Sequence, residues 1–417
     1  MRILFLTQYY PPEVGAAQNR LSRLATFLKQ SGHTVTVLTA LPNYPIGAIY
    51  EGYKDRLVVG EIKDGITVIR TWLYTRRNLK FVGRLINYLS FSGMALLVSM
   101  YKVGRQDIVI AESPPLFVGA VGFIISNMKK AKFVFNVSDL WTDSAIDLGM
   151  LKNSILIGMA QRVENFLYRK ADLITGQTQG IVDKIQSRVN NRPIALITNG
   201  VDQAHFGQAA DQYANRRRNG SPVKRFSIGY AGLHGLMHDL ESVIEAADLL
   251  RAYEDVFFVF YGDGPRKEKL IQLAKEARIR NIVFYPPQPV GRMPEIFGSF
   301  DAMVIPLKRL GVLKGAIPFK MLEAMAAALP IVLAGEGEAE KLVRDAECGI
   351  VVEPENPKSL AEGLLELYHN ESCRRRFGEN ARDYVLQHYD QRQISTKFAH
   401  LLSKVVYGEE HVALENT

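Results

Sequence analysis

The stretch LKGAIPFKMLEAMAAALPIVLA, at Leu313 to Ala334, reads as a loop, a helix and a buried strand. Gly315 and Pro318 open the turn, helix-forming residues run from Phe319 to Ala328, and Pro330 ends the helix before the apolar run IVLA. The first backbone N–H groups of such a helix have no partner within it and carry the positive end of its dipole. The stretch therefore predicts a turn that can hold a phosphate.

Two charged residues sharpen this prediction. Lys320 adds a positive charge beside the helix N-terminus, and Glu323 lies one turn further in. A carboxylate there can accept two hydroxyl protons from a ribose, but it would repel a phosphate. Diphosphate at the helix tip with ribose behind it is the arrangement of a bound nucleotide. An ordinary loop, helix and strand with no ligand would show the same pattern, so both readings stay open.

The length and composition bound the rest of the chain. The 417 residues are too many for one hydrophobic core, which predicts two domains. Two cysteines among average hydrophobic and charged fractions argue against a disulfide framework and favour a reducing, cytoplasmic location. The formal net charge of +8 suits anionic ligands or an anionic membrane face, and no nucleic-acid motif accompanies it.

Two segments raise the question of targeting. MRILFLTQYYPPEVG at the start has a short apolar run that ends in turn residues, which predicts a first strand rather than a signal peptide. Leu85 to Tyr101 is apolar but short and contains Asn87 and three serines, so we expect a buried or surface-lying helix there rather than a membrane span.

Short apolar runs alternate with helical segments along the chain, which predicts α/β domains with doubly wound parallel sheets. The expected strands of the first half are 3–7, 34–39, 58–61, 67–70, 108–111, 132–136, 173–175 and 195–198. The expected helices between them are 16–31, 81–102, 117–128 and 156–168. Several of these strands are continuously apolar, as strands covered on both faces must be.

A second domain begins after a composition break. The polar segment from Gly207 to Lys224 includes three consecutive arginines and reads as a mobile connection. Strands are then expected at 226–230, 256–261, 282–285, 302–305, 331–334 and 349–352, with helices at 240–253, 266–277 and 391–407. We place the domains at 1–205 and 206–390, with the helix at about 391–417 crossing back onto the first.

Three loops follow strand ends, where ligands sit in open α/β sheets. PPEVGAA offers Gly15 for close approach to a helix N-terminus, YAGLHG offers Gly232 and is followed by His238, and GDGPR offers Arg266 for a phosphate or a base. Small residues at such turns are common for steric reasons alone. His234 and His238 lack a partner carboxylate at metal spacing, so we expect no metal site.

The run VSDLWTDSA, at Val137 to Ala145, follows a further strand. Asp139, Trp141 and Asp143 in a loop facing the cleft would suit hydroxyl recognition or an acid-base pair. Capping of the next helix explains the same carboxylates equally well.

Seven motifs in order resemble the family 4 glycosyltransferases of GT-B fold, in particular the bacterial branch that builds surface polysaccharides and includes N-acetylfucosamine transferases. They are QYYPPEVGAAQNR at 8–20, LPNYPIGAIYEGY at 41–53, SPPLFVG at 113–119, SDLWTDSAIDLGML at 138–151, NGVD at 199–202, GDGP at 262–265 and PFKMLEAMAAALPIV at 318–332. The resemblance covers nearly the whole chain.

This resemblance implies a retaining transferase with two Rossmann-like domains facing a cleft. The nucleotide sugar would bind mainly to the second domain, and the acceptor, a free or lipid-linked glycan, would enter from the first. Glu323 matches the ribose-binding Glu, Lys320 matches the lysine that the branch places before it, and Gly15 matches the glycine of the first-domain loop. The sequence departs from the family at Gly315, at Leu233 and His238, where a basic pair is usual, and at Ser138, Thr142 and Asp143.

The predicted chemistry is transfer of a hexose or N-acetylhexosamine from a nucleoside diphosphate sugar. No DxD sequence occurs to bring a metal, so Lys320, the helix N-terminus at Pro318, Phe319 and Lys320, and Arg266 would stabilise the leaving group. Asp139 would orient the acceptor or the transferred sugar. The basic flank Arg76, Arg77, Lys80 and Arg84 before the apolar helix suggests peripheral association with an anionic membrane. A sugar-nucleotide 2-epimerase and a non-catalytic scaffold subunit remain alternatives.

Overall fold

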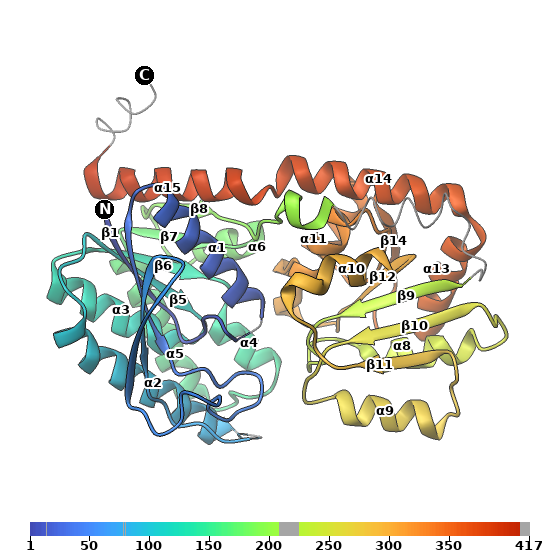
Figure 1. Cartoon of the computed structure of the whole chain (residues 1–417), viewed down its shortest axis with the longest axis horizontal. Coiled ribbons are helices and arrows are strands. Elements are labelled where there is room, and N and C mark those ends of the chain that lie inside the picture. The colour runs from blue at the N-terminus through green and yellow to red at the C-terminus, as the bar shows by residue number, and fades with distance from the viewer. Residues whose placement is uncertain (14, 78, 80, 208–224, 409–417) are drawn as a thin grey trace. The chain divides into compact units, whose positions relative to one another are not determined.

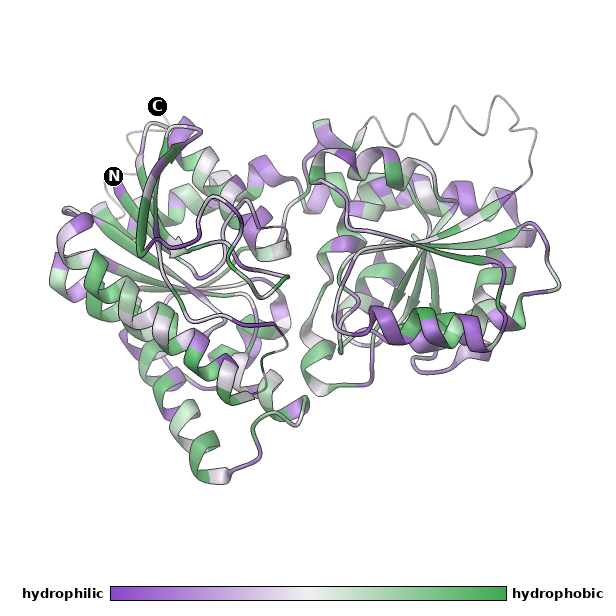
Figure 2. Ribbon diagram, turned by 60° about the horizontal axis from the view of Figure 1, so that its bottom comes forward, coloured by the Kyte–Doolittle hydropathy of each residue, from purple (hydrophilic) through white to green (hydrophobic). Residues whose placement is uncertain are grey.

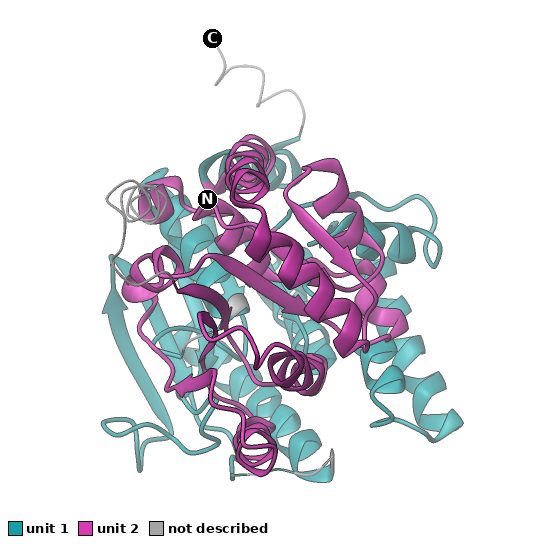
Figure 3. Ribbon diagram, turned by 90° about the vertical axis from the view of Figure 1, so that its right-hand side faces the viewer, with its two compact units in different colours: residues 1–198, 392–417 teal, residues 199–391 magenta. Residues whose placement is uncertain are grey.

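In the computed structural model, the described residues are 1–417 without 14, 78, 80, 208–224 and 409–417. The chain forms two compact units (Figure 3). Unit 1, in teal, comprises Met1–Thr198 with Arg392–Thr417, and unit 2, in magenta, comprises Asn199–Gln391. Nearly all of the predicted polar connection, including its three arginines, lies outside the described residues, as does Lys80 of the predicted basic flank.

Unit 1 contains an eight-stranded sheet with the order β3-β4-β2-β1-β5-β6-β7-β8 (Figure 1). Its strands are β1 Arg2–Leu6, β2 Thr34–Ala40, β3 Val58–Lys63, β4 Ile66–Thr71, β5 Ile108–Ser113, β6 Lys132–Val137, β7 Leu173–Gly176 and β8 Ile194–Leu196. Every strand predicted from the first half is present, and all neighbours pair in parallel except β3 with β4.

The antiparallel edge corrects the expectation of a parallel sheet. β3 and β4 form a hairpin across Asp64 and Gly65, which both have positive φ. Two residues with positive φ fit a type I′ turn, for which Asp-Gly is a preferred sequence. This dipeptide indicates a hairpin, which the pattern of apolar residues in the strands does not reveal.

Alternate residues of each strand face two helical layers. Leu4 and Leu6 of β1 pack on one face, whereas Ile3 and Phe5 pack on the other. The first face is covered by α2 Phe81–Lys102, α3 Leu116–Lys129, α5 Ser154–Lys170 and α6 Gln179–Gln186. The second face is covered by α1 Ala16–Gln30 and α15 Gln391–Tyr407. Period-two patterning is what makes both faces apolar.

Unit 2 repeats the plan with six parallel strands in the order β11-β10-β9-β12-β13-β14. The strands are β9 Phe226–Ala231, β10 Val256–Tyr261, β11 Ile282–Tyr285, β12 Ala302–Pro306, β13 Ile331–Ala334 and β14 Gly349–Val352. Its helices are α8 Leu240–Leu249, α9 Lys267–Glu276, α10 Met293–Gly298, α11 Phe319–Ala326, α12 Glu338–Asp345, α13 Pro357–His369 and α14 Glu371–His388. These elements confirm the prediction of two α/β sheets.

Two predicted helices end at least two residues early. α8 ends at Leu249, four residues before Tyr253, and α11 ends at Ala326 rather than Ala328. Ala328 has a φ of 57°, and the N–H of the residue after it donates to the carbonyl of Ala324. This left-handed closure at Ala328 ends the helix ahead of Pro330. Leu329 directly precedes the proline, so it disfavours the helical conformation as well.

Candidate active site

The site begins at the first turn of α11. Gly311–Gly315 form a short 3-10 turn, Pro318 is the extended N-cap residue, and α11 starts at Phe319. Phe319 is buried and anchors the helix start, so the backbone of this turn is held in place. The turn thus has the helix N-terminus that the sequence predicted.

Lys320 points from this turn toward the end of β9. Its Nζ lies 2.7 Å from Tyr230 Oη and 3.0 Å from His238 Nε2, and 4.3 Å from the centroid of the Tyr230 ring. Both hydrogen-bonding neighbours are uncharged groups. Within the described part of the chain, Lys320 makes no ion pair with a carboxylate.

Burial sets the protonation states of Lys320, Tyr230 and His238. Desolvation lowers the pKa of Lys320 to about 7, and the negative charge of Glu323 offsets only part of this fall. Burial, and then the ammonium of Lys320, hold the pKa of His238 well below its usual range. Burial also raises the pKa of Tyr230 far above its usual range. At neutral pH the imidazole and the phenol are therefore neutral, and Lys320 is the group that titrates.

Two glycines allow the loops after β9 and β10 to pack closely beside Lys320. Gly232 follows β9 with a φ of 145°, and a Cβ there would lie 3.0 Å from Lys320 Cε. Gly262 follows β10 with a φ of 140°, and a Cβ there would lie 1.9 Å from the carbonyl oxygen of Gly232. No larger residue fits Gly262 without moving the backbone. The YAG and GDG loops are thus packed against each other beside Lys320.

Glu323 lies one turn behind Lys320 on α11 and is 8% exposed. Residues three apart in a helix share a face, so the carboxylate and the ammonium lie along one side of α11. The structure therefore brings together Pro318, Phe319, Lys320, Glu323, Gly232 and His238, all of which the sequence nominated.

Arg266, which the sequence nominated for a phosphate or a base, has a carboxylate partner in its own unit. It is the N-cap residue of α9 and forms an ion pair with Glu241 at the start of α8. Lys269 lies 3.7 Å from the same carboxylate. The guanidinium is thus already neutralised by a carboxylate of its own unit. His234 is fully buried next to the GDG loop, and burial lowers its pKa to about 4.

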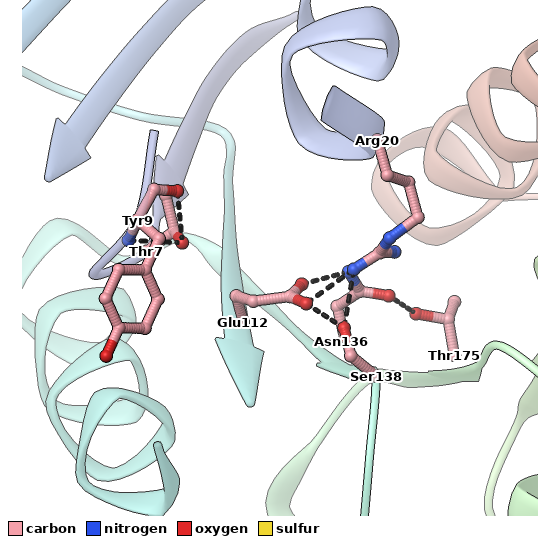
Figure 4. Close-up of polar contacts among 7 residues, drawn as sticks. All are labelled: Thr7, Tyr9, Arg20, Glu112, Asn136, Ser138 and Thr175. Carbon is pink, nitrogen blue, oxygen red and sulfur yellow. Dashed lines mark hydrogen bonds and ion pairs between the residues drawn. The ribbon is translucent and has the colours of Figure 1, made fainter. Parts of the chain in front are cut away.

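The corresponding strand ends of unit 1 carry a buried polar network (Figure 4). Arg20 of α1 donates to Glu112 at 2.5 Å and to Ser138 Oγ at 2.6 Å. Glu112 also accepts hydrogen bonds from Asn136 and from Ser138. Thr175 donates to the Asn136 side chain at 2.5 Å. The network joins α1 to the ends of β5, β6 and β7.

Gly15 and Asp139, two further predicted site residues, also belong to unit 1. Gly15 is the extended N-cap residue of α1, so it starts the helix that carries Arg20. Asp139 follows Ser138, is half-buried and accepts a hydrogen bond from Ser144 Oγ at 2.8 Å. Burial raises the pKa of Asp139 above its ordinary value.

The expectation that Asp139, Trp141 and Asp143 share one loop is wrong. Trp141 and Asp143 lie in the helix α4, Trp141–Asp147, and only Asp139 precedes it, where it accepts a hydrogen bond from Ser144 Oγ. Asp143 forms an ion pair with Arg188 at 2.5 Å. This partner lies 45 residues away in the sequence, so spacing within the motif gave no sign of it.

One site residue was missed. Tyr230 supplies both the hydroxyl and the ring beside Lys320, but it is the last aromatic residue of a buried strand and reads as core. Its position directly before the AG pair of the YAG turn was the available signal.

Comparison with known proteins identifies the class. The family model described as "Glycosyl transferase 4-like domain" matches residues 15–200, and the model described as "Glycosyl transferases group 1" matches residues 211–384. The chain is a family 4 glycosyltransferase. The two matches fall on the two halves of the chain, one on the sheet with Arg20 and the other on the sheet with Lys320.

Three proteins illustrate what this glycosyltransferase is similar to. WcaI of Escherichia coli (strain K12), whose name refers to colanic acid biosynthesis, is 26% identical over 377 residues, which cover 88% of this chain and 92% of the relative. The sucrose-phosphate synthase of Thermosynechococcus elongatus has a TM-score of 0.75 at 15% identity, with 98% of this chain and 100% of that chain covered. Anabaena HepE, solved with UDP and glucose, has a TM-score of 0.70 at 18% identity, covering 97% and 100%. The two solved structures match the GT-B fold.

Proposed function

We propose that this glycosyltransferase moves a hexose or an N-acetylhexosamine from a nucleoside diphosphate sugar to a hydroxyl of a free or lipid-linked glycan, with retention, in cytoplasmic steps of surface polysaccharide synthesis. The relation to WcaI supports the polysaccharide context, because the name of that protein refers to colanic acid. The solved complex of HepE with UDP and glucose supports a nucleotide sugar as donor.

The main support for the proposal is the position of Lys320. It is a cation at a helix N-terminus, it contacts only neutral hydrogen-bond partners among the described residues, and a buried carboxylate lies one turn behind it. A diphosphate fits the first two features, since it is anionic and accepts hydrogen bonds. A ribose fits the third, since Glu323 can accept from its two hydroxyls.

The leaving group determines the chemistry required of the site. When the bond from the sugar to the diphosphate breaks, negative charge grows on the phosphate oxygens, and donors placed there in advance stabilise it. Lys320 and the N–H groups of the α11 start would supply this stabilisation without a metal. Bound diphosphate also favours the ammonium form of Lys320, whose pKa of about 7 in the free protein leaves room for proton uptake.

The acceptor side is assigned to unit 1. We infer that Gly15 lets the substrate approach the start of α1, and that Asp139 orients the acceptor or the transferred sugar. The attacking hydroxyl can pass its proton to the departing phosphate oxygen on the same face, so that the proton lost by the acceptor is gained by the leaving group. A separate side-chain base is then not needed.

The test is a calorimetric titration with a panel of nucleoside diphosphates, with and without a chelator. We expect one base to be preferred, binding to be unaffected by the chelator, and the Lys320→Ala variant to bind about 100-fold more weakly. Lys314→Ala, which removes an exposed lysine of the same stretch, is the matched control. Loss of binding in the control as well would show that the effect is not specific to Lys320.

Two further results would overturn the proposal. If no nucleoside diphosphate binds, the alternative of a non-catalytic scaffold subunit gains support. The unusual residues Gly315 and Leu233 also fit that alternative. If the donor alone is converted into an isomer without an acceptor, the protein acts as a sugar-nucleotide epimerase. Product analysis with and without a glycan acceptor separates transfer from epimerisation.

A further inference from the structure

Exposed apolar side chains are concentrated on one helical layer of unit 1. Among the described residues, 22 large apolar side chains are exposed, and thirteen of them lie on α2, α3 and α5. These helices pack side by side on the same face of the sheet, with α3 in contact with both α2 and α5. Figure 2 colours the chain by hydropathy, and green apolar residues run along the helices of this layer. Single exposed apolar residues are ordinary, but a contiguous set marks an interaction surface.

On α2 the exposed residues form a stripe. Val82, Ile86, Leu89, Leu97, Met100 and Tyr101 are between 46% and 65% exposed. Their spacing of three and four residues, continued through the exposed Gly93, places them along one side of the helix. No charged residue occurs between Arg84 and Lys102. A helix at a water-facing surface normally has a polar outer side, so the outer side of α2 is suited to an apolar environment.

A second stripe runs along α5. Ile155, Met159, Val163 and Phe166 recur at intervals of four, four and three residues and are exposed. Ile124 and Met128 of α3 are exposed too. The three helices therefore present one apolar outer surface, which we call the apolar face.

The exposed charges on these helices are all positive. They are Arg84, Lys102, Arg162, Arg169 and Lys170. The single carboxylate, Glu164, is 2% exposed and pairs with Arg188 at 2.7 Å. An apolar stripe with flanking cations is the pattern of helices that lie in the interface of an anionic bilayer.

We propose that the apolar face of unit 1 docks on an anionic lipid surface, with the side chains of α2, α3 and α5 entering the boundary between headgroups and acyl chains. The cations around the face would then contact lipid phosphates. A second copy of the chain fits this face less well, because the two sets of cations would repel each other and no exposed carboxylate lies on the three helices to neutralise them.

α2 does not cross the membrane in this arrangement. By length and composition alone, Val82–Lys102 could span a bilayer, and a third of it is buried. Its inner side carries Phe91, Ala95 and Val98 into the core of unit 1, at exposures of 1% or less. Removing these residues to lipid would uncover the sheet. The helix therefore lies on the surface and keeps its inner side in the core.

The test uses the full-length protein and vesicle flotation. We expect it to float with vesicles of phosphatidylcholine containing phosphatidylglycerol, to float poorly with phosphatidylcholine alone, and to be partly released at high salt. Leu97→Ser with Met159→Ser should reduce the partition coefficient about tenfold or more. The matched control is Ile62→Ser with Leu249→Ser, two exposed apolar residues outside the face. Arg162→Gln with Arg169→Gln should reduce binding by about tenfold at low salt only.

The contrary outcomes are distinct. Equal loss in the control pair would show that binding does not use the apolar face, and absence of flotation with any vesicle would overturn the proposal. A dimer by light scattering, abolished by Leu97→Ser with Met159→Ser and without vesicle binding, would assign the face to a second copy. Titration with nucleoside diphosphate should be unchanged in all these variants, so this test is independent of the proposed transfer reaction.

Discussion

Arg20 of unit 1 and Lys320 of unit 2 are both cations at the carboxyl ends of parallel strands, but their partners differ. Arg20 is 2% exposed and lies 2.5 Å from the carboxylate of Glu112. Lys320 has a phenol and a neutral imidazole as its hydrogen-bonding neighbours. The same fold thus holds one cation that is neutralised and one that remains available to an anion.

The difference separates stability from function. A buried ion pair with further hydrogen bonds fixes the elements that it joins, and it has no charge left for a ligand. A cation among neutral groups is disfavoured by desolvation, which the lowered pKa of Lys320 reflects. A ligand that brings negative charge removes this penalty. We therefore expect Arg20 to matter for folding and Lys320 for binding and turnover.

The strongest effect is expected for stability, at Arg20. Arg20→Met leaves Glu112 as an uncompensated buried charge and should lower the unfolding free energy of unit 1 by about 3–5 kcal/mol. Both tryptophans of the chain, Trp72 and Trp141, belong to unit 1, so tryptophan fluorescence in a urea titration reports this unit. Adding Glu112→Gln should recover part of the loss. A loss below about 1 kcal/mol, typical of an exposed pair, would contradict the assignment.

The opposite pattern is expected at Lys320. Lys320→Met should lower turnover about 10²- to 10³-fold, as for removal of one preorganised donor at a developing anion. Its unfolding free energy should be unchanged or higher, because a folded pKa below the unfolded value means that burying the charged form costs stability at neutral pH. Sugar transfer and thermal unfolding are measured on the same samples, with Lys314→Met as control. Parallel loss of activity and stability would erase the contrast with Arg20.

A smaller effect is expected at Glu323, because this residue would contact the ribose of the nucleotide and not its diphosphate. Glu323→Gln should weaken binding of the ribonucleoside diphosphate by roughly 10- to 100-fold, since hydrogen bonds to a charged acceptor are worth about 1.5–3 kcal/mol. The 2′,3′-dideoxy analogue lacks both hydroxyls, so its affinity should hardly change in this variant. If the variant weakens both ligands equally, Glu323 supports the helix and does not contact the ribose.

Much of the fold was predictable because its signals are local. Buried strands appear as apolar runs, and the helix formers before Pro330 gave the start of α11 at Phe319, where the structure has it. The hairpin of β3 and β4 was not predicted, because the strand pattern is the same for parallel and antiparallel pairs and only Asp64 and Gly65 distinguish them.

The candidate site was predictable only where its residues are close in sequence. Lys320 and Glu323 share one helix and could be paired by spacing alone. Tyr230 meets Lys320 across 90 residues, and Asp143 meets Arg188 across 45. Such contacts depend on strand order and on the packing of loops, which periodicity does not encode. For the same reason the sequence could not show that Glu241 would neutralise Arg266.

The last prediction uses pH to compare the two cations without changing the fold. The charged form of Lys320 is the one that attracts a diphosphate, and its pKa in the free protein is about 7. Bound diphosphate raises that pKa, so binding takes up a proton above pH 7, and affinity should fall by up to about tenfold per pH unit between pH 7.5 and 9. Tyr230 and His238 stay neutral in this range, because burial raises the pKa of Tyr230 and lowers that of His238.

Calorimetry in buffers of different ionisation heat measures the proton uptake on binding of the diphosphate. In Lys320→Arg the charge persists at every pH tested, so the slope should vanish while binding remains. A slope that survives in this variant would place the titrating group elsewhere.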